Sequence, residues 1–423
     1  MSNWKFKVLV LVVLAMILLP LVGTAKTILR VQDWKINETE DTRRWYEEAK
    51  RLFEERYPDV EIQYDGIGFG NEYVEKLYIT TATDTAPDVA FVSVAWARDL
   101  FEAGALLPLN DYVAKSPHVA PDQFIPTTQI YNQKDGIIYG ITFALDADFI
   151  VYNMNHFDEM GLSTDPYAMA TWEDFINFGR KLMVYDANGN PTRYGFDFLP
   201  GTTAFSAFLD SNGGSFYNSD FTGLNIDTPQ GQEVLQLFYD IRLEYGFASD
   251  SYTAACNFLA NTASMGMGGI YHSYWAPHYV PGIRLGFTTV PVGPSGDKRG
   301  AVVYGNMYSI SSASKNPDLA WKFIEFMTSL EAAELHYRIT GTVQSPRLDF
   351  YQSDLWVSTI HEAQWRQMIP YIGMTTGIWP FVGYDRINQV WGPLISDPLS
   401  GKAPLSTNAL SEVQRLVNQY LAQ

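Results

Sequence analysis

The first hundred residues alternate between two kinds of hydrophobic pattern. Short runs rich in β-branched residues occur at 27–32, 60–64 and 89–94, and such runs are typical of strands. Between them, residues 41–57 and 71–81 carry apolar side chains at helical spacing. This alternation predicts an α/β lobe, and the continuous run VAFVSV at 89–94 favours a parallel strand that is covered on both faces.

A second lobe is expected after Tyr139, where the pattern changes. The apolar segment 141–153 is interrupted by Asp146 and Asp148, and we interpret it as a crossing between two lobes. A chain of 423 residues is also long for one hydrophobic core. The further elements that we expect are helices at 172–182, 228–245 and 317–328 and a strand at 302–309 that returns to the first lobe.

The N-terminus has the pattern of a secretory signal peptide. Lys5 and Lys7 precede an apolar run that ends at Val22, and a small-x-small site ends at Ala25. We therefore expect cleavage near Ala25 and a soluble product in the periplasm or outside the cell. No cysteine lies near that site, so we expect no lipid anchor. The single cysteine, Cys256, cannot form an internal disulfide.

Composition and motifs argue against several functions. The formal charge of −18 opposes nucleic-acid binding, which requires cations on phosphates. The six histidines have no metal-ligand spacing, and no phosphate-binding loop or nucleophile elbow is present. We therefore predict no catalytic residue, no metal and no cofactor.

The aromatic residues point to a sugar site. The stretch SMGMGGIYHSYW at 264–275 places aromatic rings after a glycine turn. A sugar site combines flat rings with polar side chains that bind hydroxyl groups. For each aromatic ring alone, the alternative is packing in the core. The ligand-binding residues that we expect are Trp34, Phe69, Asn71, Ser93, Trp96, Asp146, Asp148, Gly214, Tyr217, Tyr271, Trp275, Asn306 and Trp379.

Several segments match one family in order along the chain. These are TDTAPDVAFV at 83–92, FEAGALLPL at 101–109, the segment 135–157, the helix 171–182 and the turn 341–347. With them, the chain resembles the family 1 extracellular solute-binding proteins of ABC importers, which include maltose- and trehalose-binding proteins.

The resemblance implies a fold and a ligand cleft. It implies the two-lobe periplasmic-binding-protein fold of the type II, maltose-binding-like class, an α/β fold with a mostly parallel sheet in each lobe and the ligand between the lobes. It places a ring that stacks on the sugar at Tyr271 and the acidic hinge residue at Asp146. The tryptophan and the acidic residue that follow the P-D strand in the maltose branch are replaced by Val92 and Ala95. The lobes that we expect comprise residues 26–144 with 288–329 and residues 145–287 with 330–423.

The expected function is therefore binding without turnover. We predict a monomeric solute-binding protein that closes on a neutral carbohydrate, either a mono- or oligosaccharide or a cyclitol, and delivers it to an ABC permease. One alternative is a secreted glycoside hydrolase, which would need a pair of carboxylates. The other is the same fold with a polyamine or glycerol phosphate as its ligand.

Overall fold

The structure is a computed structural model. It describes residues 26–68, 70–83, 85–198, 200–249, 260–269, 272, 276, 279–341, 345–358 and 383–422. The predicted signal peptide (1–25) and the predicted ligand residues Phe69, Tyr271, Trp275 and Trp379 lie outside these ranges, as do the side chains of Asn71 and Asp146. Within these ranges, no helix has the length and apolar character needed to span a membrane.

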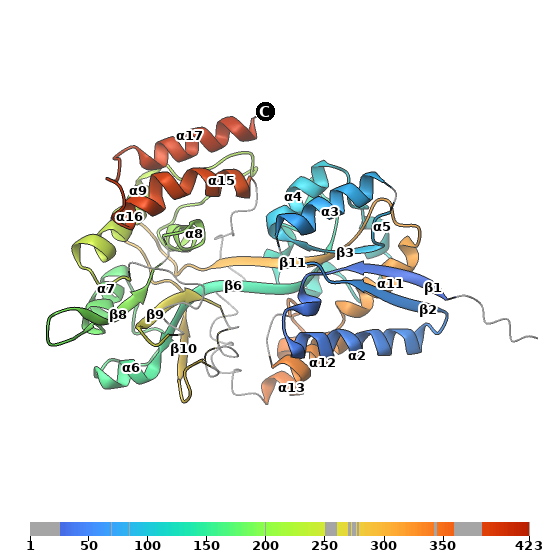
Figure 1. The fold of residues 1–423 in the computed structure, drawn as a ribbon, viewed down its shortest axis with the longest axis horizontal. Helices are drawn as coiled ribbons and strands as arrows, with labels where there is room; N and C mark the ends of the chain where they lie inside the picture. Colours follow the sequence, from blue (N-terminus) through green and yellow to red (C-terminus); the bar gives the residue numbers. More distant parts are fainter. Residues whose placement is uncertain are drawn as a thin grey trace, which may run out of the picture.

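Two lobes stand side by side and are joined by two long strands, β6 (Ile141–Asn153) and β11 (Val302–Ile310) (Figure 1). The N-terminal lobe contains β1 (Thr27–Gln32), β2 (Val60–Asp65), β3 (Val89–Ser93), α2 (Glu40–Arg56), α3 (Asn71–Ala82), α4 (Val94–Glu102), α5 (Asn110–Val113) and α11 (Pro317–Met327). The C-terminal lobe contains β7 (Val184–Tyr185), β8 (Pro191–Asp197), β9 (Ala263–Gly268), β10 (Leu285–Thr288), α6 (Met154–Glu159), α7 (Trp172–Lys181), α8 (Thr202–Ser211), α9 (Pro229–Tyr239), α15 (Tyr384–Trp391), α16 (Asp397–Leu399) and α17 (Ala409–Leu421).

The expected elements are confirmed, but the sheet is mixed where we expected mostly parallel pairing. The strand order is β2-β1-β3-β11-β6-β9-β8-β7, and β10 also pairs with β6. Only the pairs β1–β2, β1–β3 and β8–β9 are parallel. The other pairings along this path are antiparallel, and all of them except β7–β8 involve β6 or β11.

The hydrophobic cores follow this division into lobes. One core gathers side chains of β1, β3, α2 and α11, and another gathers side chains of α7, α8, α9 and α17. The helix α12 (Leu330–Thr340) packs against α2, through a contact between His336 and Trp45 with ring centroids 5.0 Å apart. We had expected residues from 330 onward to belong to the C-terminal lobe. The exact lobe boundaries stay a prediction.

A register shift occurs between the two strands that join the lobes, β6 and β11, which we call the hinge strands. Asn306 pairs with Ala144 and Met307 with Thr142, so Phe143 is an extra residue in β6. Such a β-bulge bends its strand and increases its twist. The bend therefore falls at the point where β6 leaves the N-terminal lobe.

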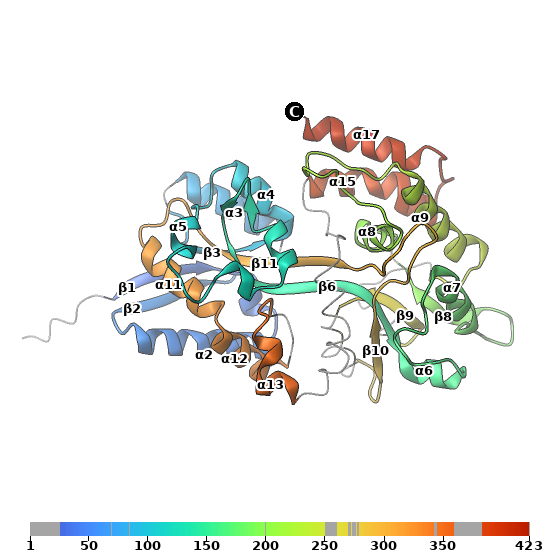
Figure 2. The same ribbon diagram turned by 180° about the vertical axis from the view of Figure 1, so that it is seen from behind.

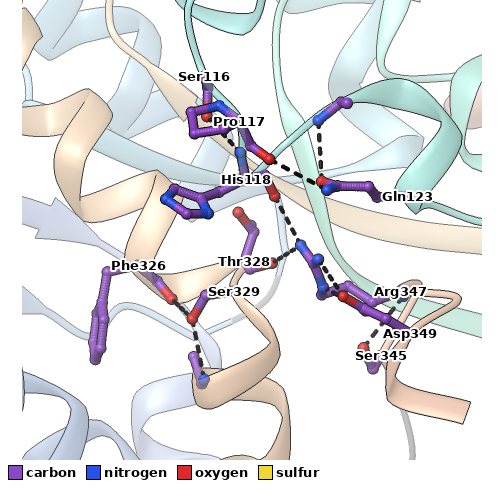
Figure 3. A network of polar contacts seen from close by, with 12 residues as sticks. Ser116, Pro117, His118, Gln123, Phe326, Thr328, Ser329, Ser345, Arg347 and Asp349 are labelled. Carbon is purple, nitrogen blue, oxygen red and sulfur yellow. Dashed lines mark hydrogen bonds and ion pairs between the residues drawn. The ribbon is translucent and has the colours of Figure 1, made fainter. Parts of the chain in front are cut away.

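The segment after α12 is held on the N-terminal lobe by Arg347 (Figure 3). Its guanidinium is buried, with the residue 5% exposed. It donates to the carbonyl oxygens of His118 at 2.9 Å and Thr328 at 3.1 Å, and to both oxygens of Asp349 at 2.8 and 2.6 Å. The chain then passes through α13 (Asp354–Val357) and next enters the described structure at α15, in the C-terminal lobe (Figure 2).

A buried carboxylate connects β1 to α2 and β11. Asp33 follows β1 directly and is fully buried. Its Oδ2 accepts hydrogen bonds from the hydroxyls of Tyr46 at 2.5 Å and Tyr308 at 2.9 Å, and its Oδ1 accepts from the backbone N–H of Lys35 at 2.8 Å. Burial raises the pKa of Asp33 from an ordinary 3.8 to about 6, because these three hydrogen bonds offset only part of the desolvation.

The raised pKa of Asp33 predicts that the stability of the protein depends on pH. The folded protein holds the Asp33 proton more tightly than the unfolded chain, so its contribution to stability is full below pH 4 and is lost as the pH rises to about 6. The free energy of unfolding of the wild type, relative to Asp33→Asn, should therefore fall by up to about 3 kcal/mol between these pH values.

Urea denaturation at several pH values measures this difference. The matched control is Asp59→Asn, which changes an exposed aspartate of the same lobe. A plot of its free energy of unfolding against pH should stay parallel to the plot for the wild type. A difference between wild type and Asp33→Asn that does not vary with pH would contradict the prediction.

Candidate functional site

The two faces of the hinge strands differ in chemistry. Leu145, Ala147 and Phe149 of β6 belong to a hydrophobic cluster that also includes Phe350 and Trp356. Because side chains alternate along a strand, Asp148 belongs to the opposite face. The hinge strands therefore have one apolar face and one face that carries polar groups.

The polar face is built by the register of β6 and β11. Tyr304 and Asn306 of β11 share a face, and the hydroxyl of Tyr304 donates to Oδ1 of Asp148 at 3.2 Å. Asn306 pairs with Ser93 at the end of β3. We call Asp148, Tyr304, Asn306 and Ser93 the polar floor. Asp146 pairs with Tyr304 in the backbone register.

An aromatic wall stands beside this floor in the N-terminal lobe. The ring of Trp34 lies edge-on to Trp96 and to Tyr73, with centroids 5.4 and 5.1 Å apart, and Tyr73 stacks on Trp96 at 5.6 Å. Trp34 and Trp96 are each 8% exposed, so only a small part of each residue reaches the surface. We call these three residues the aromatic wall.

Local structure explains why the wall forms where it does. Trp34 follows β1, and Trp96 lies in the first turn of α4, which Ser93 caps by accepting from the N–H of Ala95 at 3.3 Å. The carboxyl ends of parallel strands meet at one edge of a sheet. Sequence reasoning missed Tyr73, because no local pattern distinguishes it from other apolar positions of α3.

The remaining predicted residues lie elsewhere or are only partly described. Tyr217 is 3% exposed and packs in the core of the C-terminal lobe against Phe216 and Phe221. Gly214 lies in the turn after α8, against Leu209. It stays a prediction that these two residues, and Asn71 and Asp146, contact the ligand.

The stretch SMGMGGIYHSYW contributes a strand and a buried histidine. Its first half lies in β9, which pairs with β6. The ring of His272 packs against Gly268, where a Cβ atom would lie 2.2 Å from its Cε1 atom. Burial lowers the pKa of His272 to about 4, so its ring is neutral at pH 7.

The space between the lobes continues beyond the aromatic wall as a hollow of about 520 Å³. On one side it is lined by the α4 residues Trp96, Arg98, Asp99 and Glu102. On the other side it is lined by Phe221, Tyr384, Arg386 and Tyr420 of the C-terminal lobe. We call this space the rim hollow. Phe221 and Tyr420 carried no sequence signal, since the fold alone brings them opposite α4.

The polar floor and the aromatic wall bring packed rings and oriented polar groups together. Among the residues that the structure describes, no cluster of His, Cys, Asp and Glu side chains could hold a metal ion. Rings that are already packed and polar groups that are already oriented lose little entropy when a ligand binds. The arrangement thus places aromatic rings and hydrogen-bonding groups side by side.

Comparison with known proteins places the chain in a family. The model of the bacterial extracellular solute-binding proteins matches residues 35–334. An arabinooligosaccharide-binding protein of Halalkalibacterium halodurans is 24% identical over 328 residues, which cover 74% of this chain and 70% of that protein. A protein of the same name from Bacillus subtilis is 24% identical over 312 residues, covering 70% and 69%.

Solved structures agree with the fold. A substrate-binding protein of Listeria monocytogenes in complex with cycloalternan has a TM-score of 0.78 and 19% identity, covering 94% of this chain and 99% of that chain. The sugar-binding protein MalE of Xanthomonas citri has a TM-score of 0.77 and 19% identity, covering 94% and 98%. These similarities confirm the expected two-lobe α/β fold. Since the family model spans well over half of the chain, the protein belongs to the bacterial extracellular solute-binding proteins.

Proposed function

We propose that this protein binds a neutral carbohydrate between its lobes and delivers it to an ABC permease. The observation that carries the proposal is the polar floor beside the aromatic wall, formed by Asp148, Tyr304 and Asn306 next to Trp34 and Trp96. The names of the relatives, which include arabinooligosaccharide-binding proteins, support the same class of ligand.

Closure follows from the position of the site. A ligand that contacts both lobes interacts more strongly with the closed arrangement than with the open one, and this difference in affinity shifts the population. The protein works outside the cytoplasm as a monomer, after removal of residues 1–25, and it catalyses no reaction. The closed form then presents surfaces of both lobes to the permease.

The charges of the site favour a neutral ligand over an anionic one. A phosphorylated polyol would require arginines that are available to bind its phosphate, so we consider Arg98, which lines the rim hollow, and the buried Arg347. Arg98 pairs with Glu102 at 3.1 Å and Arg347 with Asp349 at 2.6 Å. The carboxylate of Asp148 on the floor would also repel a phosphate.

A thermal-shift screen of ligand-free protein tests the class of ligand. The panel contains sugars, cyclitols, polyamines and glycerol phosphates. A ligand present at a hundred times its Kd should stabilise the protein by about 2.7 kcal/mol, which raises the Tm by a few degrees. We expect shifts with one class of saccharide, which is recovered unchanged. Shifts with only a polyamine or a phosphate, or hydrolysis of the saccharide, would contradict the proposal.

The substitution Asp148→Asn tests the polar floor. A hydrogen bond from a sugar hydroxyl to a carboxylate is worth about 1.5–3 kcal/mol, so the affinity should fall about tenfold to a hundredfold. Isothermal titration calorimetry with the saccharide found in the screen measures this loss. The control Asp297→Asn, which changes an exposed aspartate outside the cleft, should bind like the wild type. Equal affinities for all three proteins would remove Asp148 from the site.

A further inference from the structure

We propose that Asp33 is a positioning residue for ligand binding, because its carboxylate links the aromatic wall to the polar floor. This inference rests on the proposed function and deepens it. Asp33 is fully buried, so it acts through its neighbours rather than by touching the ligand. These neighbours are Trp34, which follows it in the chain, and Tyr308, which lies two residues beyond Asn306 of the polar floor.

One oxygen of the carboxylate fixes the turn that carries Trp34. Oδ1 of Asp33 accepts from the backbone N–H of Lys35 at 2.8 Å. A side chain that accepts from the N–H group two residues later closes an Asx-turn. Trp34 lies inside this turn and is the N-cap residue of the short 3-10 helix η1 (Lys35–Asn37). The backbone conformation that aims the Trp34 ring therefore depends on the Asp33 side chain.

The end of β1 is fixed separately, by Tyr73 of the aromatic wall. The Tyr73 hydroxyl lies within hydrogen-bond distance of the carbonyl oxygens of Gln32, at 2.8 Å, and Phe91, at 2.7 Å. The Nε2 atom of Gln32 donates to the carbonyl oxygen of Tyr73 at 3.1 Å. Tyr73 thus determines where β1 ends, and Asp33 determines the direction in which the chain continues.

The other oxygen of the carboxylate reaches the strand that forms the floor. Oδ2 of Asp33 accepts from the hydroxyl of Tyr308 at 2.9 Å. Tyr308 and Asn306 are two residues apart in β11, so their side chains belong to the same face of the strand. The register between β11 and β6 shifts between Asn306 and Met307, and a bulge locally disrupts the ladder of hydrogen bonds. The bond to Asp33 therefore supports β11 next to the place where its pairing with β6 is interrupted.

Tyr46 provides a comparison within the same cluster. Its hydroxyl donates to the same Oδ2 atom at 2.5 Å and lies 3.3 Å from the hydroxyl of Tyr308. Both tyrosines are buried. Tyr46, however, belongs to α2, which carries no residue of the aromatic wall or the polar floor. Both hydroxyls stabilise the buried carboxylate, but only the hydroxyl of Tyr308 connects it to the floor.

The link requires two polar atoms at position 33 and not a negative charge. In Asp33→Asn, the side-chain oxygen can accept from the N–H of Lys35, and the NH2 group can donate to the hydroxyl oxygen of Tyr308. The variant Asp33→Ala has neither group and leaves two buried tyrosine hydroxyls without their acceptor. The amide therefore preserves the link, and the alanine removes it.

Affinity and stability measured on the same variants test the proposal. Calorimetric titration of the mature protein uses arabinotriose, maltotriose and any further saccharide that raises the Tm in the ligand screen. Urea denaturation gives the free energy of unfolding. Tyr308→Phe and Tyr46→Phe each remove one hydroxyl from the same oxygen, so both should lower the free energy of unfolding. Only Tyr308→Phe should also weaken saccharide binding, by about tenfold.

Variants of Asp33 separate positioning from a purely structural role. Asp33→Asn should bind saccharide within about twofold of the wild type, because it keeps both links. Asp33→Ala should lose about tenfold or more in affinity. If Asp33→Ala does not fold, the two tyrosine variants still decide the question, since each keeps the carboxylate and the volume of the ring.

The outcomes distinguish this inference from the proposed function. If the wild type binds a saccharide and the two tyrosine variants bind it equally well, Asp33 does not position the site, and the proposed function stands. The same conclusion follows if both variants lose affinity to the same extent, or if Asp33→Asn loses as much as Asp33→Ala. If the wild type binds none of the saccharides, both proposals fail.

Discussion

The antiparallel pairing of β6 with β11 is the constraint on which the rest of the structure depends. Both strands serve two lobes, so their side chains must satisfy two cores and a site at the same time. Alternation solves this problem, because Leu145, Ala147 and Phe149 pack on one face and Asp148 is left on the other. A shift of one residue in register would move the acid into the hydrophobic cluster. The same pairing that joins the lobes therefore also forms the floor of the site.

In the N-terminal lobe, the residues of the candidate site are preorganised by packing and hydrogen bonds. The Asp33 carboxylate is held by two tyrosine hydroxyls and one backbone N–H group, and it directly precedes Trp34. Trp34 in turn is packed between Trp96, Tyr73 and Phe91. These side chains lose their conformational entropy on folding, so ordering them does not reduce the affinity for a ligand.

The sequence was sufficient for the elements and insufficient for the way in which they combine. The strands 27–32, 60–64 and 89–94 and the helices between them were recognisable because each has its own hydrophobic period. The mixed sheet was not, because strand direction depends on which lobe a segment enters. Trp34, Ser93 and Trp96 were predicted as ligand residues because they follow predicted strands, and the structure places Trp34 against Trp96 and pairs Ser93 with Asn306. Tyr73, Phe221 and Tyr420 were missed because only tertiary packing places them beside the site.

The central claim is that the two lobes close about β6 and β11 when a saccharide binds to the polar floor. Small-angle X-ray scattering of the mature protein, with and without saturating saccharide, tests this claim most directly. The account predicts that the radius of gyration decreases on binding. A radius of gyration that is unchanged at saturation would contradict it, because the ligand would then bind without bringing the lobes together.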